Sequence, residues 1–138
     1  MKKLFAALAA ALALCLCFAA VSCAGNGGSE KGEWKLEFFG DGAQNYSVGD
    51  VYGGKTVEAD YFECSFDGAR YKVFREGDIV MEGRYSAENV GEDSLLLALE
   101  TEGRRSLWNC GIRTENSGRQ TLVITGEVDG LNVSFIEK

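Results

Sequence analysis

The chain is dominated by short runs in which apolar and polar residues alternate, and glycine-containing turns separate these runs. The first run, residues 33–38 (EWKLEF), has the period of two that suits a half-buried strand and no helix. Asp67-Gly68 and Asp129-Gly130 are typical of tight hairpin turns. Eight such runs follow one another between residues 33 and 138, nearly all joined by short loops. This pattern predicts eight strands that pair with their neighbours in the chain.

The predicted fold class is all-β. Sequential hairpins favour an eight-stranded antiparallel up-and-down barrel, because closure pairs the two edges that an open sheet would expose. A two-sheet β-sandwich made of the same strands is the alternative. Gly83, Gly111 and Gly126 fall within the runs, where glycine often marks a bulge or a tight bend.

The alternation also predicts which side chains point into the barrel. Five aromatic residues of this set are candidates for lining a cavity that holds a small apolar ligand, namely Trp34, Phe62, Tyr71, Tyr85 and Trp108. The alternative is that these rings simply fill the barrel. The other side chains predicted to point inward are Leu36, Phe38, Cys64, Phe66, Val73, Ile79, Met81, Leu95, Leu97, Leu99, Cys110, Ile112, Leu122, Ile124, Leu131, Val133 and Phe135.

Composition narrows the function classes. The chain has no histidine, which excludes His-dependent catalytic triads and His metal sites, and its formal net charge of −7 argues against nucleic-acid binding. Residues 49–56 (GDVYGGKT) match the phosphate-loop pattern, but strand-like residues follow where that loop needs a helix. We interpret this match as chance. The sequence predicts no enzyme activity and indicates no metal or cofactor.

The N-terminal segment is typical of a secretory signal peptide. Lys2 and Lys3 form a positive start, residues 4–18 are an uninterrupted apolar stretch, and small residues lead to Cys23. A transmembrane anchor is the alternative, although a span needs about 20 apolar residues and this stretch is at the short limit. Residues 1–22 are therefore predicted to be a signal peptide.

The end of that segment, Ala20-Val21-Ser22-Cys23, resembles the lipobox of bacterial lipoproteins. The resemblance implies that a diacylglycerol is attached to the Cys23 thiol and that the chain is cleaved before Cys23. Acyl chains such as palmitate would then anchor the protein at an extracytoplasmic membrane surface. Ordinary cleavage after Ser22 is the alternative. Residues 23–32 are expected to form the lipidated cysteine and a flexible tether, with the barrel domain spanning residues 33–138.

The two remaining cysteines, Cys64 and Cys110, both fall on positions predicted to point inward. An exported protein permits a disulfide between them, which would stabilise the fold by roughly 3–4 kcal/mol. Two buried free thiols are the alternative. The sequence leaves both possibilities open.

Several motifs beyond the strand pattern resemble the lipocalin-like domains of small bacterial lipoproteins. These motifs are Trp34 at the start of the first strand within residues 32–34 (GEW), residues 46–52 (YSVGDVY), 60–62 (DYF), 66–68 (FDG), 83–85 (GRY) and 129–131 (DGL). Their order covers residues 32–138. The resemblance implies a barrel fold and a place at the cell envelope.

These observations predict a non-enzymatic binding module, monomeric and held to the extracytoplasmic face of a membrane through Cys23. Its partner is expected to be either a small apolar ligand inside the barrel or another envelope protein. The second case predicts a packed interior and contacts through the outer surface.

Overall fold

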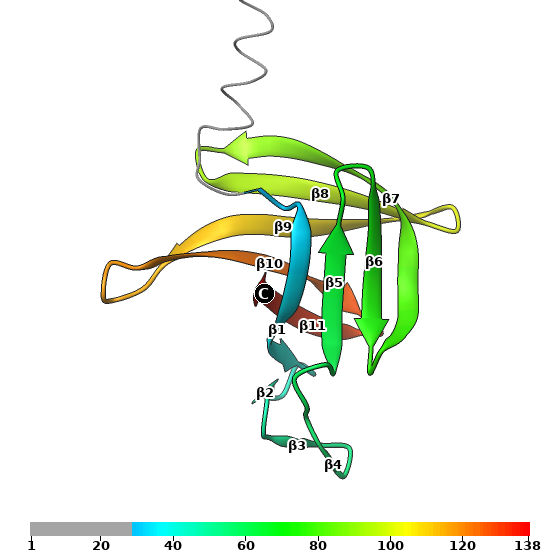
Figure 1. Cartoon of the computed structure of the whole chain (residues 1–138), viewed down its shortest axis with the longest axis vertical. Helices are drawn as coiled ribbons and strands as arrows, with labels where there is room; N and C mark the ends of the chain where they lie inside the picture. Colours follow the sequence, from blue (N-terminus) through cyan, green and yellow to red (C-terminus); the bar gives the residue numbers. More distant parts are fainter. Residues whose placement is uncertain (1–28) are drawn as a thin grey trace, which may run out of the picture.

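The computed structural model describes residues 29–138, and within this range all regular structure is β-strand (Figure 1). The strands are β1 (Gly32–Gly40), β2 (Asn45–Ser47), β3 (Val51–Tyr52), β4 (Lys55–Thr56), β5 (Phe62–Phe66), β6 (Arg70–Arg75), β7 (Asp78–Gly91), β8 (Ser94–Thr101), β9 (Arg104–Thr114), β10 (Gln120–Val128) and β11 (Leu131–Glu137). Hairpins join successive strands from β5 to β11.

Eight strands close into an antiparallel barrel. β5 to β11 pair sequentially, β1 pairs with β5, and β11 pairs back onto β1. In that last pairing Trp34 lies opposite Glu137 and Lys35 lies opposite Ile136. The predicted all-β up-and-down barrel is therefore confirmed, and the pairing of β11 with β1 excludes the open sandwich.

The connection between the first two barrel strands, β1 and β5, contains regular structure of its own. β2 extends the edge of β1 beyond β5, and β3 and β4 form a separate hairpin. Gly53 and Gly54 make the turn of this hairpin with φ angles of 59° and 81°, which glycine adopts without strain. The segment that matches the phosphate-loop pattern is thus a β-hairpin, and no helix follows it.

A bulge in β1 changes the predicted interior. The register with β11 shifts between Leu36 and Phe38, so the alternation breaks at Glu37. Phe39 is fully buried, whereas Phe38 is only half-buried. The prediction that Phe38 points inward is therefore wrong, because the extra residue moves the inward position one step along the chain.

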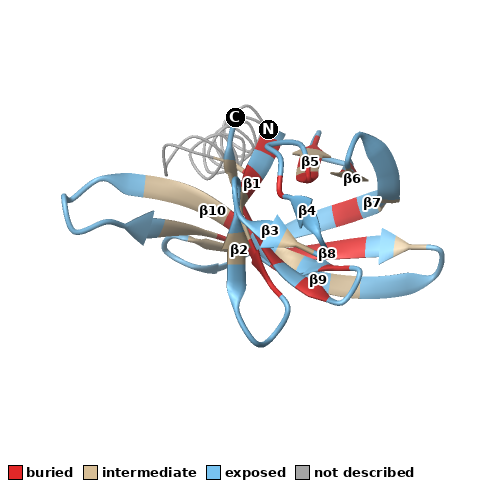
Figure 2. Ribbon diagram, turned by 90° about the horizontal axis from the view of Figure 1, so that it is seen from below, coloured by how far each residue is buried: buried red, intermediate tan, exposed pale blue. Residues whose placement is uncertain are grey.

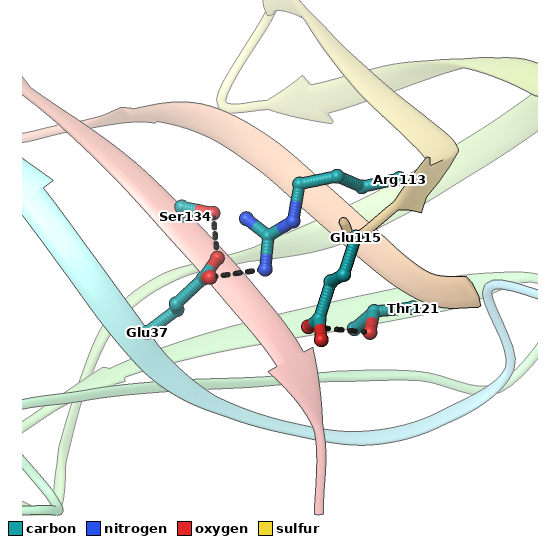
Figure 3. Close-up of polar contacts among 5 residues, drawn as sticks. All are labelled: Glu37, Arg113, Glu115, Thr121 and Ser134. Atoms are coloured by element: carbon teal, nitrogen blue, oxygen red, sulfur yellow. Dashed lines mark hydrogen bonds and ion pairs between the residues drawn. The ribbon is translucent and has the colours of Figure 1, made fainter. Parts of the chain in front are cut away.

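Glu37, the residue at this bulge, is held by polar partners on the outer surface (Figure 3). Its carboxylate accepts a hydrogen bond of 2.8 Å from the Ser134 hydroxyl and forms an ion pair of 2.5 Å with Arg113. The carboxylate also raises the pKa of the Arg113 guanidinium. These contacts tie β1 to β11 and to the end of β9.

A second bulge lies in β7. The register with β6 runs from Val73 opposite Met81 to Phe74 opposite Ile79, which leaves Val80 without a partner. Ile79 is consequently 48% exposed, so the prediction that it points inward is wrong. β7 continues from this bulge to Gly91.

The core lies inside the barrel, while the long hairpins are exposed at their ends (Figure 2). Most of the predicted inward side chains are buried there, and Met81, Leu95 and Leu122 pack against them half-buried. The buried aliphatic, aromatic and cysteine side chains are Trp34, Leu36, Phe39, Val57, Tyr61, Phe62, Cys64, Phe66, Tyr71, Val73, Tyr85, Leu97, Leu99, Trp108, Cys110, Ile124, Val128, Leu131, Val133 and Phe135.

Two of the strand glycines mark close approaches, and the bulges lie elsewhere. A Cβ added to Gly126 would lie 2.0 Å from the Trp108 ring, and one added to Gly83 would lie 1.9 Å from the backbone carbonyl oxygen of Glu100. Gly111 has ordinary space around it, with the nearest atom at 3.6 Å. Gly126 therefore makes room for an indole, and Gly83 lets the backbones of β7 and β8 meet.

Candidate functional site

The five aromatic residues predicted to line a ligand cavity lie inside the barrel, and all of them except Trp34 contact other rings. Trp34, Phe62, Tyr71 and Trp108 are at most 1% exposed, and Tyr85 is 7% exposed. Phe66 joins three of them, with ring centroids 4.9 Å from Tyr85, 6.2 Å from Tyr71 and 6.3 Å from Trp108. The rings thus occupy the space that an apolar ligand would need.

The polar atoms on these rings mostly find partners within the protein. The Trp34 indole donates a 2.8 Å hydrogen bond to the backbone carbonyl of Glu30, and the Tyr71 hydroxyl contacts the hydroxyl of Thr101. Burial raises the pKa of the Tyr71 hydroxyl. Trp108 Nε1 is the one buried side-chain polar atom without a partner in residues 29–138.

Glu30 extends the folded domain into the segment that the sequence analysis assigns to the tether. Its side chain is buried, and its carboxylate accepts a 3.3 Å hydrogen bond from the Tyr85 hydroxyl. That hydroxyl in turn accepts a 2.7 Å hydrogen bond from the backbone N–H of Gly68. Burial, together with the nearby Glu30 carboxylate, raises the pKa of Tyr85. Glu30 thus connects the N-terminal segment to β7 and to the turn between β5 and β6.

Cys64 and Cys110 are buried free thiols in this structure. Burial raises the pKa of both, that of Cys110 to about 12, and the charge of Cys110 contributes to the rise at Cys64. Both side chains belong to the buried core of the barrel. No group of three or more potential metal ligands exists within residues 29–138.

An aromatic cluster joins β1 to the segment that holds β2, β3 and β4, which lies beneath β1 in Figure 1. Phe39 is at its centre, with ring centroids 5.3 Å from Tyr46 and 5.2 Å from Tyr61. The Arg75 guanidinium lies 5.2 Å from the centroid of the Tyr61 ring and donates a 2.7 Å hydrogen bond to its hydroxyl. The loop before β5 therefore packs as a plug, because Tyr52 from β3 also contacts Phe39 at 5.0 Å.

The predicted lipid-attachment residue, Cys23, lies outside the described residues, as does the predicted signal peptide. Acylation at Cys23 therefore stays a prediction. In residues 29–138 no helix has the length and apolar character needed to cross a membrane.

The outer surface carries a groove that the sequence analysis missed. Its volume is about 540 Å³ and its lining contains four of the seven arginines of the chain. We call it the arginine groove. It is lined by Arg70, Gly83, Arg84, Glu100, Glu102, Gly103, Arg104 and Arg105.

The strand register builds the arginine groove. Arg70 on β6 lies opposite Arg84 on β7, Arg84 lies opposite Glu100 on β8, and Glu100 lies opposite Arg105 on β9. Their chain neighbours Tyr71, Tyr85 and Leu99 are buried, so this row faces outward. One line of paired positions thus brings together residues far apart in the sequence.

The arginines of the groove make no ion pair within the part of the chain that the structure describes. Glu100 lies between Arg84 and Arg105 in register, yet neither guanidinium is within ion-pair distance of its carboxylate. Arg70 has an electrostatic neighbour, Asp67, whose pKa is lowered chiefly by backbone hydrogen bonds and also by Arg70. By contrast, Arg75, Arg113 and Lys138 are all paired with carboxylates.

A second outer groove, of about 600 Å³, lies over β8 to β11 and is more apolar. Phe38, Leu96 and Leu107 contribute apolar side chains, and Leu107 is 59% exposed. Asn109 and Thr125 add polar groups from the neighbouring strands. Both grooves thus lie on the outside of the barrel.

Comparisons with protein-family models, with curated proteins and with solved structures give no match. The resemblance to lipocalin-like lipoprotein domains therefore rests on the sequence motifs and remains a prediction.

Proposed function

We propose that the protein is an exported, lipid-anchored binding module of the cell envelope that contacts its partner through the outer surface of the barrel. The observation that carries this proposal is the filled interior, where Trp34, Phe62 and Trp108 are at most 1% exposed. A carrier of small apolar ligands needs a cavity lined by such rings. Here Phe62 packs against Phe39 and Trp108 packs against Phe66 and Phe135, while the grooves lie outside.

Anchoring is the second part of the proposal, and the residues before Cys23 support it. Removal of residues 1–22 takes away two lysines and no acidic residue, so the formal net charge changes from −7 to −9. A protein this acidic is repelled by anionic lipid headgroups, and membrane attachment would then depend on acyl chains. The proposed module is non-enzymatic and works as a monomer.

Replacement of Cys23 by Ser tests the anchor directly. Cells expressing the wild-type chain are labelled with radioactive palmitate and fractionated, and we expect label and protein in the membrane fraction. Cys23→Ser should lose the label and leave the membrane fraction. Cys17→Ser is the matched control, since it makes the same change six positions earlier and should behave like the wild type.

Two outcomes of this experiment would overturn the anchored module. One is unchanged palmitate label on the Cys23→Ser chain. The other is a wild-type chain that carries no label and leaves the membrane fraction.

A further inference from the structure

We propose that the arginine groove is a binding site for phosphate groups of an anionic ligand. This inference rests on the proposed function, because it assigns a ligand chemistry to the outer surface of the module. Guanidinium groups present planar forks of N–H donors that match the oxygens of phosphate in pairs. Arg84, Arg104 and Arg105 offer such forks from one groove without intramolecular ion pairs.

The charge of the groove differs in sign from that of the molecule. Four arginines and two glutamates, Glu100 and Glu102, give the groove a net charge of +2, whereas the whole chain carries −7. The local positive region attracts anions, whereas the negative charge of the rest of the surface repels them. A ligand with two or more negative charges fits this balance.

The spacing of the row suits a ligand with more than one phosphate group. Arg84 and Arg105 are separated by one strand, which carries Glu100. Neighbouring strands lie about 4.8 Å apart, so the two arginine backbones are roughly 10 Å apart. Long arginine side chains from both sides therefore converge on a space that a chain of linked phosphates can occupy.

At one point of the groove the backbones of β7 and β8 lie unusually close together. A Cβ on Gly83 would meet the Glu100 carbonyl oxygen at 1.9 Å, so β7 and β8 approach there more closely than any other residue would allow. Arg84 and Glu100 are positioned by this contact, since one follows Gly83 and the other carries the contacted carbonyl. The site is thus built on strands, and only Gly103 and its neighbours come from a turn.

Titration calorimetry of the full chain in a non-ionic detergent with sodium tripolyphosphate tests the proposal. Arg84→Gln together with Arg105→Gln should weaken binding by roughly 10–100-fold, as expected for the loss of hydrogen bonds to charged groups. Arg84→Lys together with Arg105→Lys keeps the charge and removes the forks, so we expect an intermediate loss. Circular dichroism checks that each variant is folded.

The matched control removes two positive charges elsewhere on the exposed surface. Lys55→Gln together with Arg119→Gln changes the net charge equally and lies outside the groove, so its affinity should stay within about twofold of the wild type. Absence of tripolyphosphate binding by the wild type would overturn the proposal. Equal weakening in the groove variant and in this control would overturn it as well.

A second arm distinguishes a soluble phosphate from a lipid headgroup. The Cys23→Ser chain is sedimented with phosphatidylcholine vesicles that contain or lack phosphatidylglycerol. Phosphatidylglycerol-dependent sedimentation in addition to tripolyphosphate binding, lost in the glutamine variant, would identify a lipid headgroup. Tripolyphosphate binding without such sedimentation would identify a soluble ligand. The Cys23 label reports on anchoring separately, so failure of phosphate binding and failure of the anchor are read independently.

Discussion

At the residue scale, the indole of Trp108 lies so close to Gly126 that only glycine fits at this position. Any side chain at this position would enter the Trp108 ring, since a Cβ would lie 2.0 Å from it. We expect Gly126→Ala to lower the free energy of unfolding by about 1–3 kcal/mol, the usual cost of overpacking a core. Urea denaturation measures the change. Gly111→Ala is the control, because its nearest atom is at 3.6 Å, and equal losses at the two positions would contradict the predicted clash.

The buried thiols predict how stability depends on pH. In the unfolded chain a thiol ionises near pH 8.5. Burial raises the pKa of the Cys64 thiol well above its ordinary value, and it raises the pKa of Cys110 to about 12. The folded state therefore keeps protons that the unfolded state loses. This contribution is complete below about pH 8.5 and decreases as the pH rises towards 12.

We expect the reduced protein to lose up to about 2 kcal/mol of stability per thiol between pH 8 and pH 10, at roughly 1.4 kcal/mol per pH unit. Urea denaturation at the two pH values measures the loss. The Cys64→Ala, Cys110→Ala double variant should show a much smaller pH dependence. A reduced wild type whose stability stays constant from pH 8 to pH 10 would contradict the buried free thiols.

At the scale of single elements, the bulge in β1 decides which phenylalanine belongs to the core. Phe39 is fully buried at the centre of the aromatic cluster, while Phe38 lines the apolar outer groove. Phe39→Ala should lower the free energy of unfolding by about 3–5 kcal/mol, the range for a buried phenylalanine. Phe38→Ala should cost much less. Thermal or urea denaturation measures the free energy of unfolding of both variants. A larger loss for Phe38→Ala than for Phe39→Ala would contradict the bulge.

The strands show how far alternation alone predicts a structure. Eight barrel strands and most inward side chains follow from it, because one face of each strand is buried. Phe38 and Ile79 are predicted wrongly, because a bulge inserts one residue into β1 and one into β7. No residue type in either strand indicates where such a bulge lies. The arginine groove depends on register between β6, β7, β8 and β9, and only the adjacent pair Arg104-Arg105 is visible in the sequence.

At the scale of the whole molecule, closure and filling of the barrel determine where a partner can bind. The pairing of β11 with β1 leaves no open sheet edge between the barrel strands, and the rings inside contact one another. The loop between β1 and β5 adds the aromatic plug at one end. The alternating runs and their turns predict a small barrel, but they do not reveal whether its interior is hollow, because that depends on how individual rings pack.

Chemical-shift mapping of the ¹⁵N-labelled protein tests most directly whether ligands bind outside a filled barrel. The protein is titrated with tripolyphosphate and, separately, with dodecanoate as a small apolar ligand. We predict that tripolyphosphate shifts the amide signals of Gly83, Arg84 and Arg105, and that the indole signal of Trp34 moves with neither ligand. A Trp34 indole signal that shifts on addition of dodecanoate, with groove signals unmoved by tripolyphosphate, would contradict binding outside a filled barrel.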